Sequence, residues 1–190
     1  MINKKTFILV AIAFSACCKD EIVSTHKLTD TQKSLIPFRG TKTLSFVDRD
    51  GEVFEANRNT NDPVVSTYRK GAESCQLGQT EELISRLTFN STEIDVIELR
   101  LFADVFTSFG IRTERAGELT QRLHLACDDL ENLIVEEAKQ DIEIEGFNYT
   151  DVLVFESCSN TDAIRRLIYS SANGVEFIEY SDDNRWLKLN

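Results

Sequence analysis

Short segments of alternating apolar and polar residues, joined by glycine-containing turns, constrain this chain most strongly. Residues 43–47 and 53–56 alternate in this way, and the turn-forming residues 48–51 lie between them. A second pattern of the same kind spans residues 164–180 around Asn173-Gly174. Alternation places one face of a strand in a core, and glycine supplies the positive φ that tight turns need. The sequence therefore predicts two β-hairpins.

The rest of the chain also favours strands. Further strand-like segments lie at residues 83–89, 94–102, 142–144, 152–155 and 186–189. In residues 94–102 the alternation places Glu98 and Arg100 on one side, together with Ile94, Val96 and Phe102. Residues 57–63 are polar and are expected to form a loop. In residues 114–139 the apolar spacing fits a helix, although residues 119–127 also alternate. We predict a helix within residues 128–138, capped by Asp128 or Asp129, and leave the part before it open.

These elements indicate the fold class. The predicted strands follow one another as hairpins, and no long alternation of strand and helix is present. With 42% hydrophobic residues in 190, the chain can build one core. We expect a mainly β fold, or α+β with one short helix, in which an antiparallel meander forms a curved sheet, a half-barrel or a barrel. Residues 35–190 are predicted to be one β-rich domain.

The N-terminus has the features of an export signal. Lys4 and Lys5 precede an apolar run at residues 7–14, and Ser15-Ala16-Cys17 follows. A charged start, a short apolar region and small residues before a cleavage point are typical of a secretory signal. The run is too short to span a bilayer, which takes about 20 helical residues. We predict a signal peptide at residues 1–16 and a polar tether at residues 17–34.

The residues around the predicted cleavage point resemble a bacterial lipobox. In lipoproteins the cysteine becomes the acylated N-terminus, and Cys17 is the residue that matches it. Lys19, Asp20 and Glu21 resemble the short export signal that sends lipoproteins of Bacteroidota to the outer face of the outer membrane. The resemblance implies a lipid-anchored, surface-exposed outer-membrane protein, with the inner leaflet as the alternative.

The C-terminal part carries a second resemblance. Residues 146–152 read Gly-Phe-Asn-Tyr-Thr-Asp-Val, an aromatic hairpin with Tyr169 and Gly174-Val175 follows, and residues 186–189 read Trp-Leu-Lys-Leu. This order is similar to the C-terminal pattern of uncharacterised surface lipoproteins of Bacteroidota. The resemblance covers about residues 144–190 and the signal. It implies a β-rich envelope protein and no activity.

The composition excludes several chemistries. A net charge of −11 argues against nucleic-acid binding, which needs a basic face. His26 and His124 are the two histidines, and no zinc, phosphate-loop or nucleophile-elbow motif is present. We therefore expect no catalytic residues, metal ligands or cofactor. One disulfide among Cys75, Cys127 and Cys158 has three possible pairings, and three buried free thiols are the alternative.

The function expected from these features is a binding or interaction role at the cell envelope. The acyl anchor is expected to insert into the membrane. The ligand is expected to be a protein, a glycan or a lipid, and the sequence does not distinguish among these three. One alternative is a periplasm-facing carrier of lipids or lipoproteins, whose mark is a curved sheet with an apolar concave face. The other alternative is a hydrolase that uses two carboxylates in one cleft.

Overall fold

The computed structural model divides the chain into two compact units. The smaller unit holds residues 1–25 and 67–79, and the larger unit holds residues 26–66 and 80–190. The structure describes residues 19–36, 38–72, 74–91, 95–103, 108–115, 118–125, 137–159, 162–182 and 185–190. No helix in these ranges is long and apolar enough to cross a membrane.

The elements are almost all strands, as the alternating pattern predicts. In chain order they are β1 (Glu21–His26), α1 (Asp30–Lys33), β2 (Gly40–Asp48), β3 (Val53–Thr60), β4 (Val64–Arg69), β5 (Gln76–Phe89), β6 (Val96–Phe102), β7 (Ser108–Arg115), β8 (Glu118–Leu123), β9 (Gln140–Ile144), β10 (Phe147–Glu156), β11 (Ile164–Ser170), β12 (Gly174–Tyr180) and β13 (Trp186–Leu189). The main sheet runs β8-β7-β6-β5-β3-β2-β13-β12-β11-β10-β9.

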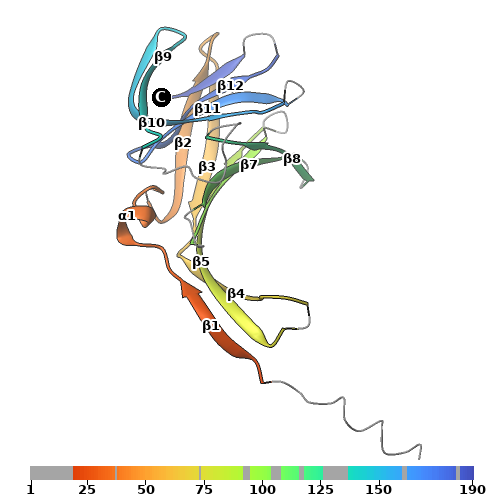
Figure 1. Cartoon of the computed structure of the whole chain (residues 1–190). Helices are drawn as coiled ribbons and strands as arrows, with labels where there is room; N and C mark the ends of the chain where they lie inside the picture. Colours follow the sequence, from red (N-terminus) through yellow and green to blue (C-terminus); the bar gives the residue numbers. More distant parts are fainter. Residues whose placement is uncertain are drawn as a thin grey trace, which may run out of the picture. The chain divides into compact units, whose positions relative to one another are not determined.

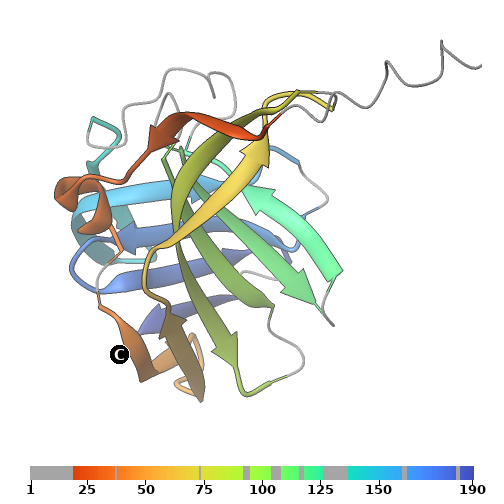
Figure 2. The same cartoon turned by 90° about the horizontal axis from the view of Figure 1, so that it is seen from below.

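The sheet of the larger unit is antiparallel and curls into a half-barrel (Figure 1, Figure 2). Its concave face holds the main core, in which Phe46, Phe155 and Tyr169 are almost fully buried. A second, smaller core lies around Phe177 and Trp186, whose rings stack with centroids 5.6 Å apart. The mainly β, curved-sheet prediction is therefore confirmed.

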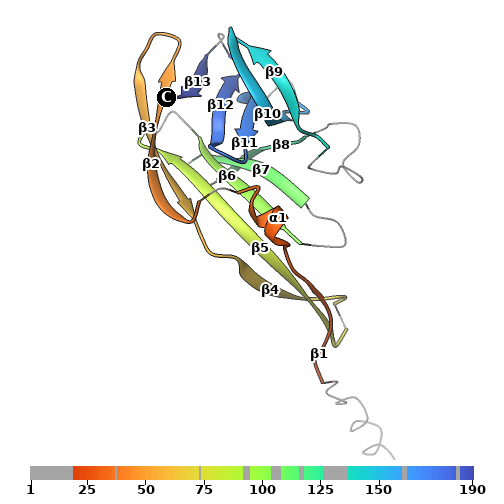
Figure 3. The same ribbon diagram turned by 90° about the vertical axis from the view of Figure 1, so that its left-hand side faces the viewer.

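The C-terminal strand β13 joins two parts of this sheet. Leu187 on β13 pairs with Asp48 on β2 on one side and with Ile178 on β12 on the other (Figure 3). Strands β2 to β8 thus connect to strands β9 to β12 through the four residues of β13. An isolated antiparallel bridge between His124, just after β8, and Glu156 on β10 joins the two halves a second time. Because the pairing partners are far apart in sequence, local pattern alone does not predict this order.

Both predicted hairpins are confirmed. In the β2–β3 turn, the Asp48 carboxylate accepts hydrogen bonds from the backbone N–H groups of Asp50 and Glu52, at 3.0 and 2.8 Å. Gly51 has φ +82° there, and Gly174 has φ +86° in the β11–β12 turn. Both glycines therefore occupy the left-handed region that side chains disfavour.

Two boundaries predicted from sequence differ from the structure, and a third lies largely outside the described residues. Residues 57–60 belong to strand β3 and not to a loop, because they pair with both β2 and β5. The expected tether at residues 17–34 contains β1 and α1, and Leu28 is buried in the core, so the tether prediction is wrong for these described residues. Most of the helix predicted at residues 128–138 lies outside the described residues, and residues 118–123 form a strand.

In the smaller unit, β1 and β4 both pair with β5. The ring of Tyr68 on β4 lies across Gly78 on β5, where an added Cβ would be 2.4 Å from the ring. Arg69 pairs with Asp20 at 3.2 Å on the same unit. Gly78 is therefore required by the close approach of an aromatic ring and not by its backbone angle.

Phe46→Ala tests the core on the concave face. Phe46 is 0% exposed and packs against Phe89 with ring centroids 5.3 Å apart. Its truncation leaves a cavity and is expected to lower the free energy of unfolding by about 3–5 kcal/mol. Urea titration followed by tryptophan fluorescence measures this change. Val53→Ala is the control at an exposed strand position, with an expected change below about 0.5 kcal/mol; equal effects would contradict the assignment of this core.

Candidate functional site

A row of charged side chains crosses four strands on the face of the sheet opposite the main core. Arg86 on β5 is in register with Glu98 on β6, and Glu98 is in register with Arg112 on β7. Arg112 is in turn in register with Arg122 on β8. We call these four residues the arginine–glutamate row. Their neighbours along each strand, such as Leu87 and Ile97, face the core, so the alternation of the strands places the row on one face.

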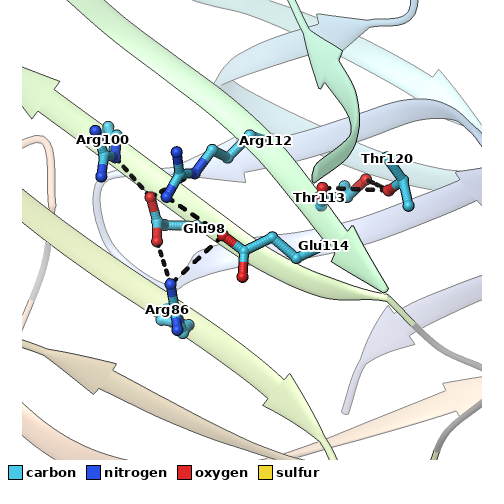
Figure 4. A network of polar contacts seen from close by, with 7 residues as sticks. All are labelled: Arg86, Glu98, Arg100, Arg112, Thr113, Glu114 and Thr120. Carbon is cyan, nitrogen blue, oxygen red and sulfur yellow. Dashed lines mark hydrogen bonds and ion pairs between the residues drawn. The ribbon is translucent and has the colours of Figure 1, made fainter. Parts of the chain in front are cut away.

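Glu98 is the centre of this row. Its side chain is 2% exposed, and Figure 4 shows its carboxylate between three guanidinium groups. Arg86 Nη2 donates to Glu98 Oε2 at 2.6 Å, and Arg100 Nε donates to Glu98 Oε1 at 2.6 Å. Arg112 Nε lies 2.7 Å from the same Oε1 atom. A buried carboxylate is stable only when it is paired in this way.

The pKa of Glu98 reflects both its burial and its partners. Burial alone would raise the pKa of this carboxyl, because it disfavours the charged form. The hydrogen bonds from Arg86, Arg100 and Arg112 outweigh burial, and the pKa lies below the usual carboxyl value of 4.5. Glu98 is therefore ionised at neutral pH and holds the arginines in place, and it is no candidate for a general acid.

The outer end of the row is not balanced. Arg112 and Arg122 are directly opposite each other across β7 and β8, and like charges in such a pair repel. Arg112 Nη2 is 3.3 Å from Glu114. In the described part of the chain, Arg122 makes no ion pair. Counting Arg86, Arg100, Arg112 and Arg122 against Glu98 and Glu114, the cluster carries two surplus positive charges.

These surplus charges line a cavity of about 290 Å³ at the edge of the sheet. We call it the arginine cavity. Its lining residues are Arg100, Phe102, Gly110, Ile111, Arg112, Arg122, Leu123 and His124. Gly110 has no side chain to fill it, and an added Cβ there would meet nothing within 4 Å. The cavity thus combines guanidinium donors and a histidine with an apolar wall, which suits a small organic anion.

The residues predicted from sequence lie elsewhere. Cys75 and Cys158 are disulfide-bonded cysteines in the structure, whereas Cys17 and Cys127 lie outside the described residues. Of the predicted sorting signal, Asp20 forms the ion pair with Arg69, and Glu21 begins strand β1.

A larger cavity lies over residues of the C-terminal pattern. It measures about 630 Å³, and its lining includes Tyr149, Asp151 and Glu176. Tyr149 Oη is buried without a hydrogen-bond partner, and Asp151 has a positive φ of 55° within an irregular stretch of β10. Asp151 is ion-paired with Lys139 at 2.7 Å. Two carboxylates thus share this cavity, and the two-carboxylate hydrolase stays a prediction.

The concave face has the apolar character expected of a lipid carrier, but side chains fill it. The cavity described on that face, next to Arg58, measures about 10 Å³ and is too small for an acyl chain. No group of metal-ligating side chains occurs among the residues that the structure describes. The carrier hypothesis likewise stays a prediction.

The arginine cavity was not predicted from the sequence. The alternation of residues 94–102 placed Glu98 and Arg100 on one side of a strand, and the structure confirms this for the described residues 96–102. The register that brings Arg112 and Arg122 beside them is set by the pairing of β6, β7 and β8. No family model, no curated protein and no solved structure matches this chain.

Glu98→Gln tests the role of the buried carboxylate. At pH 7 the variant leaves three guanidinium groups without their shared anion, and we expect it to be less stable by about 1–3 kcal/mol. Because the pKa of Glu98 is lowered in the folded state, its contribution is present above pH 4.5 and is lost as the pH falls through the folded-state pKa. The difference between wild type and variant should therefore shrink in acid.

Urea titrations between pH 7 and pH 3 measure this dependence. Glu55→Gln, at an exposed position on β3, removes the same charge and should have little effect at any pH. A wild-type-to-Glu98→Gln difference that stays constant down to pH 3 would contradict the ionised, arginine-paired state of Glu98.

Proposed function

We propose that this protein is a lipid-anchored protein of the cell envelope that binds a small organic anion in the arginine cavity. The observation that carries the proposal is the like-charge pair of Arg112 and Arg122 at the wall of that cavity. A chain with a net charge of −11 has carboxylates in excess, yet the described residues leave Arg122 without one. An anionic ligand would remove the repulsion between the two arginines.

The geometry around Glu98 prepares the arginines for such a ligand. Glu98 engages the Nε atoms of Arg100 and Arg112, and Glu114 lies 3.3 Å from Nη2 of Arg112, so carboxylates of the chain hold both guanidinium groups in place. Held side chains lose less rotamer freedom when a ligand binds. The buried carboxylate thus acts as a positioning group for the cations that would contact the ligand.

The lining narrows the ligand class. Guanidinium groups recognise carboxylate, sulfate and phosphate through paired N–H donors. Phe102 offers apolar surface on the same cavity, whereas Ile111 and Leu123 are buried in the main core beneath it. A volume of about 290 Å³ suits a ligand with one anionic group and one ring or short apolar part. A sugar acid or a phosphorylated or sulfated ring compound has this chemistry.

The proposal of a lipid anchor is based on the N-terminal residues. The apolar run at residues 7–14 and the lipobox-like residues before Cys17 support acylation of that cysteine. Lys19, Asp20 and Glu21 support transfer to the outer face of the outer membrane. An acyl anchor would retain a binding domain at the envelope without a spanning helix.

Gly110→Val and Arg122→Gln test the binding function. Valine at position 110 fills open space at the floor of the arginine cavity, and its branched side chain suits a strand. Arg122→Gln removes one donor and one positive charge. We expect each variant to weaken binding of 4-nitrophenyl phosphate at least about tenfold, Gly110→Val because it occupies ligand space and Arg122→Gln because it removes a charged hydrogen bond. Isothermal titration calorimetry, or line shifts in NMR spectra, measures the dissociation constant.

Two controls make this test specific. Arg165→Gln changes the same charge at an exposed arginine on β11 and should bind the probe as the wild type does. The neutral 4-nitrophenyl glucoside should bind neither the wild type nor the variants, because it lacks an anionic group. Wild-type protein that fails to bind 4-nitrophenyl phosphate, 4-nitrophenyl sulfate and glucuronate would overturn the proposed function.

Cys17→Ala tests the anchor separately. Metabolic labelling with a fatty-acid analogue should mark the wild type and not the variant, because Cys17 is the predicted acylation site. Protease treatment of intact cells should remove the wild-type domain if it faces outward. Label that persists in Cys17→Ala would refute acylation at this residue, and a domain protected in intact cells would refute surface exposure.

A further inference from the structure

Arg58 is a buried cation in the core of the larger unit. It lies on β3 between Ala56 and Thr60, which also face the concave side, and the residue is 5% exposed. A guanidinium group keeps its proton in proteins, so the charge persists wherever the side chain lies. Burying such a charge without compensation is unfavourable by several kcal/mol.

The structure compensates this charge only in part. Arg58 Nη1 donates to the backbone carbonyl of Asn173 at 3.2 Å, in the β11–β12 turn. Arg58 Nε and Nη2 are buried and have no hydrogen-bond partner among the described residues. Burial lowers the pKa of Arg58, with Tyr169 acting weakly in the opposite direction. Arg58 therefore has no carboxylate partner among the described residues, unlike the arginines that pair with Glu98.

Phe38 covers the flat face of this guanidinium. Its ring centroid is 4.2 Å from Arg58 Cζ, and the ring also lies 5.2 Å from Lys42 Nζ. Phe38 holds a positive φ of 70°, a conformation that non-glycine residues rarely adopt. The ring face attracts the positive charge, but it lies above the guanidinium plane and so accepts no hydrogen bond from N–H groups that point within that plane. The in-plane donors Nε and Nη2 stay unsatisfied.

The two unsatisfied donors share one edge of the guanidinium. In the planar fork of arginine, the N–H bonds of Nε and Nη2 on this edge run parallel, so both can point at one acceptor. Arg58 also lines a void of about 10 Å³. The other residues around the void are Leu44, Ser85, Leu87, Leu99, Tyr169, Gly174 and Val175.

The lining of the void favours a small anion over water. Ser85 Oγ is 2.8 Å from Thr60 Oγ1, and this pair shares one of its two hydroxyl hydrogens, which leaves the other free to donate. The Tyr169 hydroxyl donates to the carbonyl of Leu35. The hydroxyl oxygens of Ser85 and Tyr169 can also accept, and most of the remaining lining is aliphatic. A water could therefore be hydrogen-bonded here but would leave the charge of Arg58 unpaired, whereas an anion would meet the donors and neutralise the charge.

We propose that Arg58 and Ser85 form an internal binding site for one monatomic monovalent anion, of which chloride is the common example. The void of about 10 Å³ is too small for phosphate, sulfate and carboxylates. A halide ion is somewhat larger than a water, so its binding requires the side chains around the void to move apart slightly. The bound anion would neutralise Arg58 and so tie β3 to the β11–β12 turn. This site is separate from the arginine cavity, because the two share no lining residue.

Thermal unfolding at constant ionic strength tests the site in solution. Sodium gluconate is replaced stepwise by sodium chloride or sodium bromide, since gluconate is too large for the void. A ligand that binds only the folded state raises Tm by about 3–5 °C for each tenfold increase in its concentration above Kd. We expect this rise in wild type and in Arg122→Gln, and its loss in Arg58→Met.

Two further measurements keep the test decisive. Ser85→Ala retains the arginine and should weaken the halide response if Arg58→Met does not fold. A wild-type crystal grown in bromide should show an anomalous peak within about 3.5 Å of both Nε and Nη2 of Arg58. A bromide peak without any halide-dependent Tm would mean binding at crystal concentration only and would overturn the proposal. A water in place of bromide would overturn it as well.

Discussion

The larger unit depends on the pairing of the C-terminal strand β13 with β2 and β12. Leu187 is buried at this junction, and Phe46 on β2 is in register with Leu189. The pairing joins residues more than a hundred positions apart, so its loop-closure entropy must be offset by the core that it completes. The β2–β3 and β11–β12 hairpins are local, but only β13 places them in one sheet with a continuous concave core.

The curl of that sheet separates apolar and charged faces. Because side chains alternate along β5 to β8, each core residue on these strands has a neighbour on the opposite face. That face carries the arginine–glutamate row and the arginine cavity. Local positive charge on a chain of net charge −11 would attract a small anion over short range, since screening weakens the field of more distant carboxylates.

Glu98 and Arg58 show two ways in which this protein accommodates a buried charge. Glu98 lies within 2.7 Å of three guanidinium groups, and its lowered pKa records that compensation. Arg58 has a carbonyl, an aromatic ring and a void beside two free donors. The first arrangement is complete within the chain. The charge of Arg58 would be fully compensated only by the proposed anion.

The sequence by itself determined most of the strands, the two hairpins and the mainly β class, because alternation and turn glycines are local properties. It did not predict β1, β4 or β7, and it left the segment of β8 open. It also placed Glu98 and Arg100 on one side of their strand. It missed the strand at residues 57–60, because polar residues such as Arg58 occupy core-facing positions there. Only the tertiary structure decided the central place of β13 and the register of Arg86, Glu98, Arg112 and Arg122, since register depends on pairing between distant segments.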